Sequence, residues 1–190
     1  MNSQCGSGKL ATLLEVLEIG ESAIAFNRMK TISADYYHFH ECAEILFVTQ
    51  GVGIAVVEHK QYTVKPGRLF VFPPGRVHKI YVEHDLHNQY HRTTLHFSSA
   101  MLLPFFRDFP RQQIQFRQLS SYGEEVRIFD VSEIQNFIEA LFFRFEQLSS
   151  KNVLTINDSA FLLLQLIGLL PEHDQQQASL SGINTFSASI

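Results

Sequence analysis

Three histidines and one glutamate occur at spacings that suit a divalent transition metal. His38, His40 and Glu44 are separated by even numbers of residues, and His78 follows in a later strand-like segment. Because alternate side chains of a strand point to the same side, one uninterrupted strand would aim the first three at a common point. Imidazole nitrogens suit zinc, nickel, copper and iron, and a carboxylate widens the choice towards manganese. Four such ligands leave two open positions on an octahedral ion for a substrate or for oxygen.

Glycines and prolines at corner positions would bring the two runs together. Gly51 ends the first run, Gly67 begins the second, and Pro73-Pro74-Gly75 precedes its histidine. These residue types favour tight turns. The alternative is that the four side chains are ordinary polar residues at the mouth of a barrel. A single histidine would fit that alternative, whereas four potential ligands in two spaced runs favour a metal site.

The two runs also fit two longer patterns. Residues 38–51 fit HxHxxxExxxxxxG, and residues 67–78 fit GxxxxxPxGxxH, both without a gap. They resemble the two signature motifs of the cupin superfamily, whose fold is a double-stranded β-helix barrel. The resemblance implies that the three histidines and the glutamate are metal ligands. The usual closing asparagine is replaced by Val82, a departure that weakens the match to the enzymatic cupins.

Length and composition favour one domain. The chain has 190 residues, 45% of them hydrophobic, and a formal net charge of −4. Without a basic stripe it offers phosphate backbones little attraction, so we do not expect it to bind DNA by itself. Its two cysteines do not make a disulfide framework. A signal peptide is not evident, and the longest apolar stretch, residues 160–170, is too short to span a bilayer, which favours a cytoplasmic protein without membrane contact.

The front of the chain is rich in predicted strands. Residues 10–17 fit a short helix or an arm. Strand-like segments then follow at short intervals, separated by glycine and proline turns. They are residues 23–32, 43–49, 54–58, 61–64, 69–72, 79–83 and 90–97. This spacing indicates a β-sandwich or barrel.

The back of the chain predicts two helices. Apolar residues at helical spacing indicate the first, and they are Ile134, Phe137, Ile138, Leu141, Phe145 and Leu148. Asp130 and Glu133 resemble a capping box at its start. The second helix is predicted at about residues 158–170, with Asn157 as its N-cap and Pro171 after its end.

The second helix is apolar on almost every face, so it must be buried on more than one side. It could be sandwiched inside a monomer, but we favour a two-fold symmetric homodimer. Leu163, Leu166 and Leu170 keep roughly heptad spacing and are the predicted contact line.

A cupin barrel, two helices and a polar end resemble the N-terminal half of an AraC-type transcription regulator. Residues 40–48 and 69–78 read much like that family's barrel strands, and the resemblance spans about residues 20–170. It implies an effector-binding barrel at 1–125, a two-helix dimerisation element at 126–171, and a linker at 172–190. DNA would be bound only through a C-terminal domain that this chain does not contain. The chain would then be a piece of a longer regulator or a solitary sensor domain.

Two functions remain open at this point. The first is a sensor that binds a small, sugar-like metabolite, with or without zinc, nickel, iron or manganese. The second is a metal-dependent cupin enzyme, such as a dioxygenase or an isomerase. The candidate effector-binding residues are Tyr36, His38, His40, Glu44, Arg68, Arg76, His78, Tyr81 and His96. Arg76 could meet an anionic group, or it could be a solvated loop charge.

Overall fold

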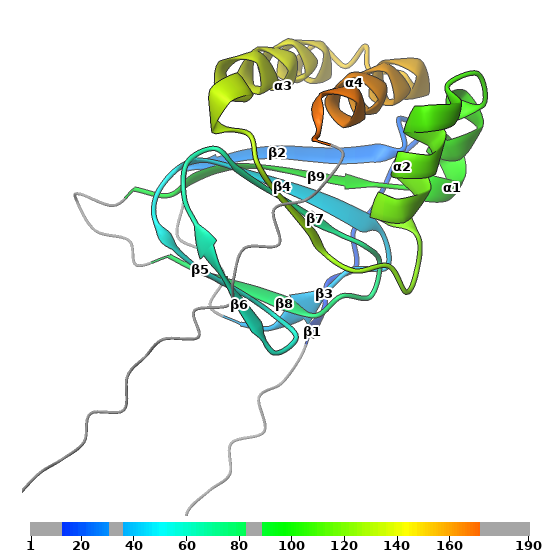
Figure 1. The fold of residues 1–190 in the computed structure, drawn as a ribbon. Helices are drawn as coiled ribbons and strands as arrows, with labels where there is room; N and C mark the ends of the chain where they lie inside the picture. The colour runs from blue at the N-terminus through cyan, green and yellow to red at the C-terminus, as the bar shows by residue number, and fades with distance from the viewer. Residues whose placement is uncertain (1–12, 31–35, 83–88, 172–190) are drawn as a thin grey trace, which may run out of the picture.

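Two five-stranded sheets face each other, and helices cover the outer side of one of them (Figure 1). The computed structural model describes residues 13–30, 36–82 and 89–171. Sheet one has the order β1 (Leu13–Leu14), β3 (His38–Phe39), β8 (His78–Tyr81), β5 (Gly53–Val57) and β6 (Lys60–Val64). Sheet two has the order β10 (Arg127–Asp130), β7 (Arg68–Phe72), β4 (Ala43–Gln50), β9 (His91–Phe97) and β2 (Ile24–Lys30). The described strands pair antiparallel, except that β1 pairs parallel with β3.

Sheet two is buried on both faces. Along β4, Ile45 and Phe47 belong to the apolar cluster beneath the helices, whereas Leu46 and Val48 belong to the cluster between the two sheets. A strand buried on both sides reads as a continuous apolar run, which is the pattern of residues 45–48. Glu44 has the parity of Leu46 and therefore faces the interior between the sheets.

The helices pack on the outer face of sheet two. The two predicted helices are present as α3 (Gln135–Ser150) and α4 (Ile156–Leu169). Four shorter elements were not predicted: α1 (Ser99–Leu102), η1 (Leu103–Phe106), α2 (Pro110–Ser120) and η2 (Ser132–Ile134). Only Phe116 and Leu119 are buried apolar residues in α2, so its sequence carries little helical periodicity. No helix in the described parts of the chain is both long and apolar enough to cross a membrane.

Both predicted helix starts are wrong in detail. The Asp130 carboxylate accepts hydrogen bonds from the backbone N–H and the hydroxyl of Ser132, at 3.2 and 2.6 Å, and does not form a box with Glu133. At α4 the N-cap is Thr155, not Asn157. Its hydroxyl accepts from the N–H of Asp158, whose carboxylate accepts from the N–H of Thr155. This reciprocal pair satisfies two helix-end donors at once, which a cap at Asn157 would not do.

The predicted contact line of the second helix lies inside the subunit. Leu163 and Leu166 are fully buried and Leu170 is 4% exposed. All three pack in the cluster between the helices and sheet two, so they do not form an exposed seam. The all-round apolar character of α4 has a simple cause: it packs against α1, α2, α3 and η1 within one chain.

Other predicted bounds differ at their ends. Residues 13–14 form β1, so the segment after residue 12 is an extended arm rather than a helix. Residues 10–12, the ends of the predicted strands 23–32 and 79–83, and the predicted linker 172–190 lie outside the described residues.

The first prediction concerns the core under α3. Phe142 is fully buried and its ring lies 5.9 Å from that of Phe26 and 5.8 Å from that of Phe47, between centroids. Phe142→Ala should lower the free energy of unfolding by about 3–5 kcal/mol, because it removes buried apolar surface and leaves a cavity. Phe143, the next residue, is 55% exposed, and Phe143→Ala should change stability by less than about 0.5 kcal/mol. Urea unfolding measures both, and equal effects would contradict this packing.

The second prediction concerns the start of α4. Thr155→Ala should lower the free energy of unfolding by about 1 kcal/mol, because it removes the capping hydroxyl. Asn157→Ala is the matched control, since Asn157 is exposed in the first turn and should change stability by less than about 0.5 kcal/mol. Chemical unfolding followed by circular dichroism distinguishes the two, and a larger effect at Asn157 would restore it as the cap.

Candidate metal and effector site

The three motif histidines and Glu44 come together from both sheets. One ligand atom of each of His38, His40, Glu44 and His78 lies within 4.8 Å of the others. His38 pairs with His78 across β3 and β8 in sheet one, whereas Glu44 projects from β4 in sheet two. The four side chains therefore converge as their spacing predicts, but the predicted cause, one uninterrupted strand for the first three, is wrong. No single strand carries the first run, because β3 ends at Phe39 and β4 begins at Ala43.

The turn before His78 joins the second motif to the first. The N–H of Gly75 donates a 2.8 Å hydrogen bond to the carbonyl of His40. Gly75 has a φ of +80°, a conformation that glycine adopts without the steric penalty of a Cβ. The Pro-Pro-Gly corner is therefore hydrogen-bonded to the backbone of His40, one of the four cluster residues.

Glu44 is the centre of the cluster. Its Oε2 atom lies 3.2 Å from Nε2 of His40, 3.2 Å from Nε2 of His78 and 3.6 Å from Nε2 of His96. His96 is the direct cross-strand partner of Glu44 on β9. Sequence spacing placed His96 among the effector candidates but did not connect it with the ligand set.

Backbone carbonyls contact the motif histidines on the side of each ring that faces away from the cluster. Their Nδ1 atoms lie 3.3 Å from Tyr36 O for His38, 3.4 Å from Glu15 O for His40 and 2.9 Å from Arg76 O for His78. A carbonyl only accepts, so Nδ1 carries the proton in each ring. The Nε2 lone pairs then face the centre of the cluster, which is the orientation that outer partners give to metal-binding histidines.

The charges at the cluster are set by burial and by mutual contact. Burial alone would raise the pKa of Glu44, but the imidazoles of His96, His40 and His78 hold the pKa of this carboxyl well below its usual value. Burial lowers the pKa of His38, helped by the nearby His78. Burial also acts to lower the pKa of His40, but Glu44 outweighs it and raises that pKa. Glu44 is therefore an anion at neutral pH, surrounded by imidazoles.

The residues fit a divalent ion. His40 Nε2 and Glu44 Oε2 are buried without a hydrogen-bond partner although they are only 3.2 Å apart. Two acceptor lone pairs at this distance repel unless a proton or a cation lies between them. Three imidazole nitrogens and one carboxylate are a donor set for zinc, nickel, iron or manganese.

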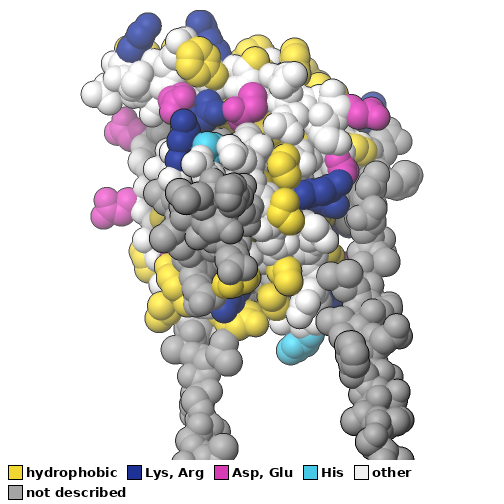
Figure 2. All heavy atoms as spheres, turned by 90° about the vertical axis from the view of Figure 1, so that its left-hand side faces the viewer, with side chains coloured by type: hydrophobic (Ala, Val, Ile, Leu, Met, Phe, Trp, Pro, Cys, Tyr) yellow, Lys and Arg dark blue, Asp and Glu magenta, His cyan; other side chains and the backbone are white. Residues whose placement is uncertain are grey.

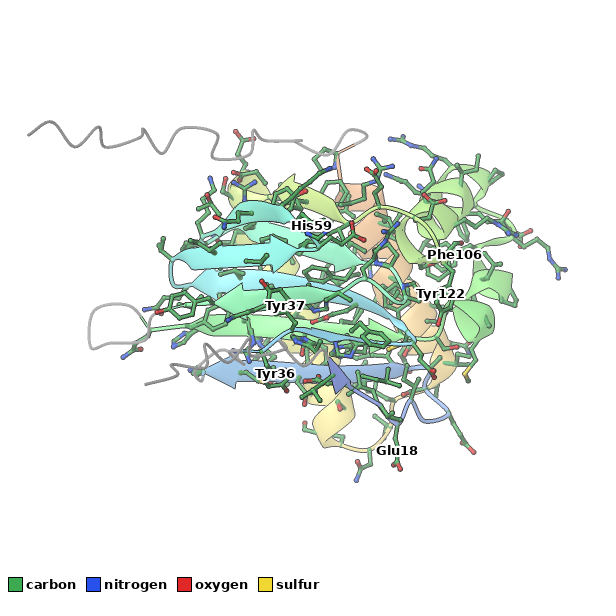
Figure 3. All side chains as sticks on the ribbon, turned by 90° about the horizontal axis from the view of Figure 1, so that it is seen from below. Glu18, Tyr36, Tyr37, His59, Phe106 and Tyr122 are labelled. Atoms are coloured by element: carbon green, nitrogen blue, oxygen red, sulfur yellow. The ribbon has the colours of Figure 1, made fainter. Side chains whose placement is uncertain are left out.

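A cavity of about 270 Å³ opens beside the cluster. Six of the predicted site residues line it: Tyr36, His38, His40, Glu44, His78 and His96. The Tyr36 hydroxyl donates to the carboxylate of Glu15, which also lines the cavity. Viewed from sheet one, Tyr36 lies next to β1 and away from Phe106 and Tyr122, which lie on the side of α1 and α2 (Figure 3).

Three predicted effector residues lie elsewhere. The Arg68 guanidinium is 4.0 Å from the carboxylate of Asp130. Arg76 binds the Glu58 carboxylate and the carbonyls of two later residues at 2.6–2.7 Å. Tyr81 is 45% exposed and does not line the cavity. The two arginines are directed at carboxylates from other segments of the chain, whereas Tyr81 lies on the exposed side of β8.

Some of the cavity residues that were not predicted lie on β9 and immediately before it. Tyr90, Arg92 and Thr94 line the cavity together with His96. These residues occupy every second position of β9 and of the segment just before it. The two-residue period of a strand was therefore visible in the sequence. The segment 92–97 alternates only partly in polarity because Thr93 and Leu95 on the opposite face are also buried.

The chain matches one family model and several solved structures. The model of the AraC-like ligand binding domain matches residues 28–182. A search of curated proteins gave no match. Among solved structures, ToxT of Vibrio cholerae bound to (E)-4-(8-methylnaphthalen-1-yl)but-3-enoic acid is 12% identical with a TM-score of 0.49, covering 77% of this chain and 54% of ToxT. An apo ToxT variant from Vibrio cholerae is 8% identical with a TM-score of 0.50, at the same coverages. A cupin-2 domain protein from Shewanella frigidimarina is 18% identical with a TM-score of 0.35, covering 40% of this chain and 72% of that one.

The chain thus spans about half the length of the ToxT chains that it resembles. The fold prediction, a mainly β, cupin-type barrel followed by helices, is confirmed by the two facing five-stranded sheets and the helices that follow them. The family model covers most of the 190 residues, including all four cluster residues and both long helices. This chain therefore belongs to the AraC-like ligand binding domain family.

Proposed function

We propose that this chain is the effector-sensing and dimerisation part of an AraC-type transcription regulator, and that a small, sugar-like metabolite binds in its barrel. One observation carries the proposal: the cavity of about 270 Å³ has the whole histidine–glutamate cluster in its wall. Ligand sites typically combine an apolar wall with a few convergent polar groups. Leu46 and Ile80 supply apolar wall beside the cluster.

A divalent transition ion would be held by His38, His40, Glu44 and His78. Such an ion would supply a Lewis acid that polarises an oxygen-containing group of the metabolite. The residues themselves prepare the site. Glu44 provides one negative charge, and the backbone carbonyls behind the imidazoles keep the Nε2 atoms directed at the centre.

Strand β2 connects the cavity with the helices. Asn27 and Met29 line the cavity, whereas the intervening Arg28 forms ion pairs of 2.6 and 3.3 Å with Glu139 and Glu146 of α3. Acidic and basic side chains lie next to one another in the upper part of the face shown in Figure 2. A ligand that displaces β2 would therefore act directly on α3. This common wall supports a sensing role.

The dimer is proposed on a different surface from the buried leucine line. Phe137 and Phe143 of α3 and Phe161 of α4 are 54%, 55% and 64% exposed. Fully burying one such side chain stabilises an assembly by roughly 1.5–3 kcal/mol. We assign the outer face of these two helices as the contact between two copies. DNA would be reached only through a further domain.

A metal-dependent cupin enzyme, such as a dioxygenase or an isomerase, is the second candidate. The observation that favours it is the complete set of four ligands, because a site that only binds an effector does not need all of them. The two functions differ in the fate of the metabolite. Recovery of the unchanged compound after incubation with metal-loaded protein supports the sensor, whereas conversion supports the enzyme.

The third prediction concerns metal binding. The unmutated chain should bind about one Zn²⁺ or Ni²⁺ per subunit. His78→Ala should weaken binding by more than about 100-fold, which exceeds the usual effect of losing a group that only hydrogen-bonds to a metal ligand. Affinity should fall as the pH drops below about 6.5, because protons compete for the imidazole nitrogens. Calorimetric titration and elemental analysis measure this, with the exposed His59→Ala as control. Unchanged binding by His78→Ala would contradict the assignment.

The fourth prediction concerns the dimer. Sedimentation velocity at micromolar concentration should show a dimer, and Phe161→Glu should shift it to monomer by placing a charge in the contact. Ile114→Glu is the control, because Ile114 is 59% exposed on α2 and should leave the dimer intact. Leu166→Glu should unfold the subunit instead, since Leu166 is fully buried. A monomeric unmutated chain would contradict the proposed contact.

A further inference from the structure

We propose that the metabolite is an anionic polyhydroxy compound, a sugar acid or a sugar phosphate, whose charged group is bound by Arg92. This rests on the proposed function and narrows the ligand class of the same cavity. The basis is a row of polar side chains on β9 and its approach, at alternate positions 90, 92, 94 and 96, all of which line the cavity.

The two ends of this row differ in chemistry, with His96 at the metal cluster and Arg92 at the opposite end. His96 is paired with Glu44 at the metal cluster. Arg92 lies four residues further along the strand, a distance of about 13 Å at 3.3 Å per residue. The Arg92 guanidinium lies 4.6 Å from the centre of the Tyr90 ring, and its Nη2 lies 3.7 Å from Met29 Sδ. Tyr90 and Met29 thus hold the cation at the end of the cavity remote from the cluster.

Along this row, buried polar atoms lack a hydrogen-bond partner among the described residues. They are Tyr90 Oη, Thr94 Oγ1 and Nδ1 of His96, whereas Nε2 of His96 lies 3.6 Å from the Glu44 carboxylate. Tyr90 is fully buried, and Thr94 and His96 are 4% and 7% exposed. Buried polar groups are almost always satisfied by the protein, by water or by a ligand. Hydroxyls and a neutral imidazole can each donate and accept, which matches the hydroxyl groups of a polyol.

With a divalent ion in the cluster, the charge of the cavity would favour an anion. The ion and Arg92 would carry formal charges of +2 and +1 against −1 each on Glu44 and Glu15, so the sum would be +1. The guanidinium fork matches a carboxylate or a phosphate with two parallel hydrogen bonds. Arg76 and Arg68 are directed to Glu58 and Asp130 outside the cavity. Among the described residues, Arg92 is the arginine that lines the cavity.

A series of six-carbon compounds tests the charge directly. Calorimetric titration of the metal-loaded chain would use gluconate, glucose 6-phosphate, glucose and sorbitol. At least one of the two anions should bind about 10-fold or more tightly than both neutral compounds, as expected for a charge-assisted hydrogen bond. The comparison of gluconate with glucose 6-phosphate distinguishes a carboxylate from a phosphate ligand.

Variants locate the anion. Arg92→Gln should weaken binding of the preferred anion by about 10-fold or more and leave sorbitol binding unchanged, and Arg92→Lys should restore part of the loss. Thr94→Val should weaken the anion and sorbitol equally, because it removes a hydroxyl contact and no charge. Arg117→Gln, on the exposed side of α2, should change neither. Circular dichroism checks that each variant is folded.

Three results would overturn the inference. The first is equal or tighter binding of glucose or sorbitol, which would leave the sensor function standing with a neutral sugar. The second is an equal loss of anion and sorbitol affinity in Arg92→Gln. The third is the absence of binding by both anions. Failure of the proposed metal site would appear separately, as loss of Zn²⁺ or Ni²⁺ binding without any metabolite present.

Discussion

The buried carboxylate of Glu44 is the constraint around which this domain is arranged. An ionised carboxylate away from water is costly unless it is paired, and here three imidazoles lie within 3.6 Å of one of its oxygens. His78 comes from sheet one, His96 from the same sheet as Glu44, and His40 from the connection between β3 and β4. The electrostatic requirement of one side chain therefore joins both sheets at the mouth of the barrel.

Sheet two separates two environments. Its inner face carries the polar row of β9 and Glu44, and its outer face carries the apolar surface on which α1–α4 pack. Because successive side chains of a strand alternate between faces, each of β2, β4 and β9 contacts the cavity and the helices at once. Phe26 on β2 contacts the rings of Phe142 and Phe145, next to Asn27 in the cavity wall. A shift of these strands cannot leave the helices unaffected in a closely packed interior.

The same arrangement explains which arginine lines the cavity. Arg76 lies within the second motif, but Glu58 and two carbonyls take up its donors. Arg68 begins β7 and is directed at Asp130, which also binds Lys65 at 2.7 Å. The Lys65 ammonium, together with the hydrogen bonds from Ser132, lowers the pKa of Asp130 to about 2. Arg92 reaches the cavity because β9 places even-numbered side chains on its inner face.

The sequence by itself determined the barrel, the two long helices and the four cluster residues, because turn residues, apolar periodicity and motif spacing are local properties. It did not determine why these four side chains meet. His38 and Glu44 were expected on one strand and lie in two sheets. It also assigned Leu163 and Leu166 to a dimer contact, although they are buried within the subunit. The sequence of an apolar helix is the same whether its neighbours belong to its own subunit or to a partner. Burial and charge compensation depend on segments distant in the chain, and only the tertiary structure decides which of them come together.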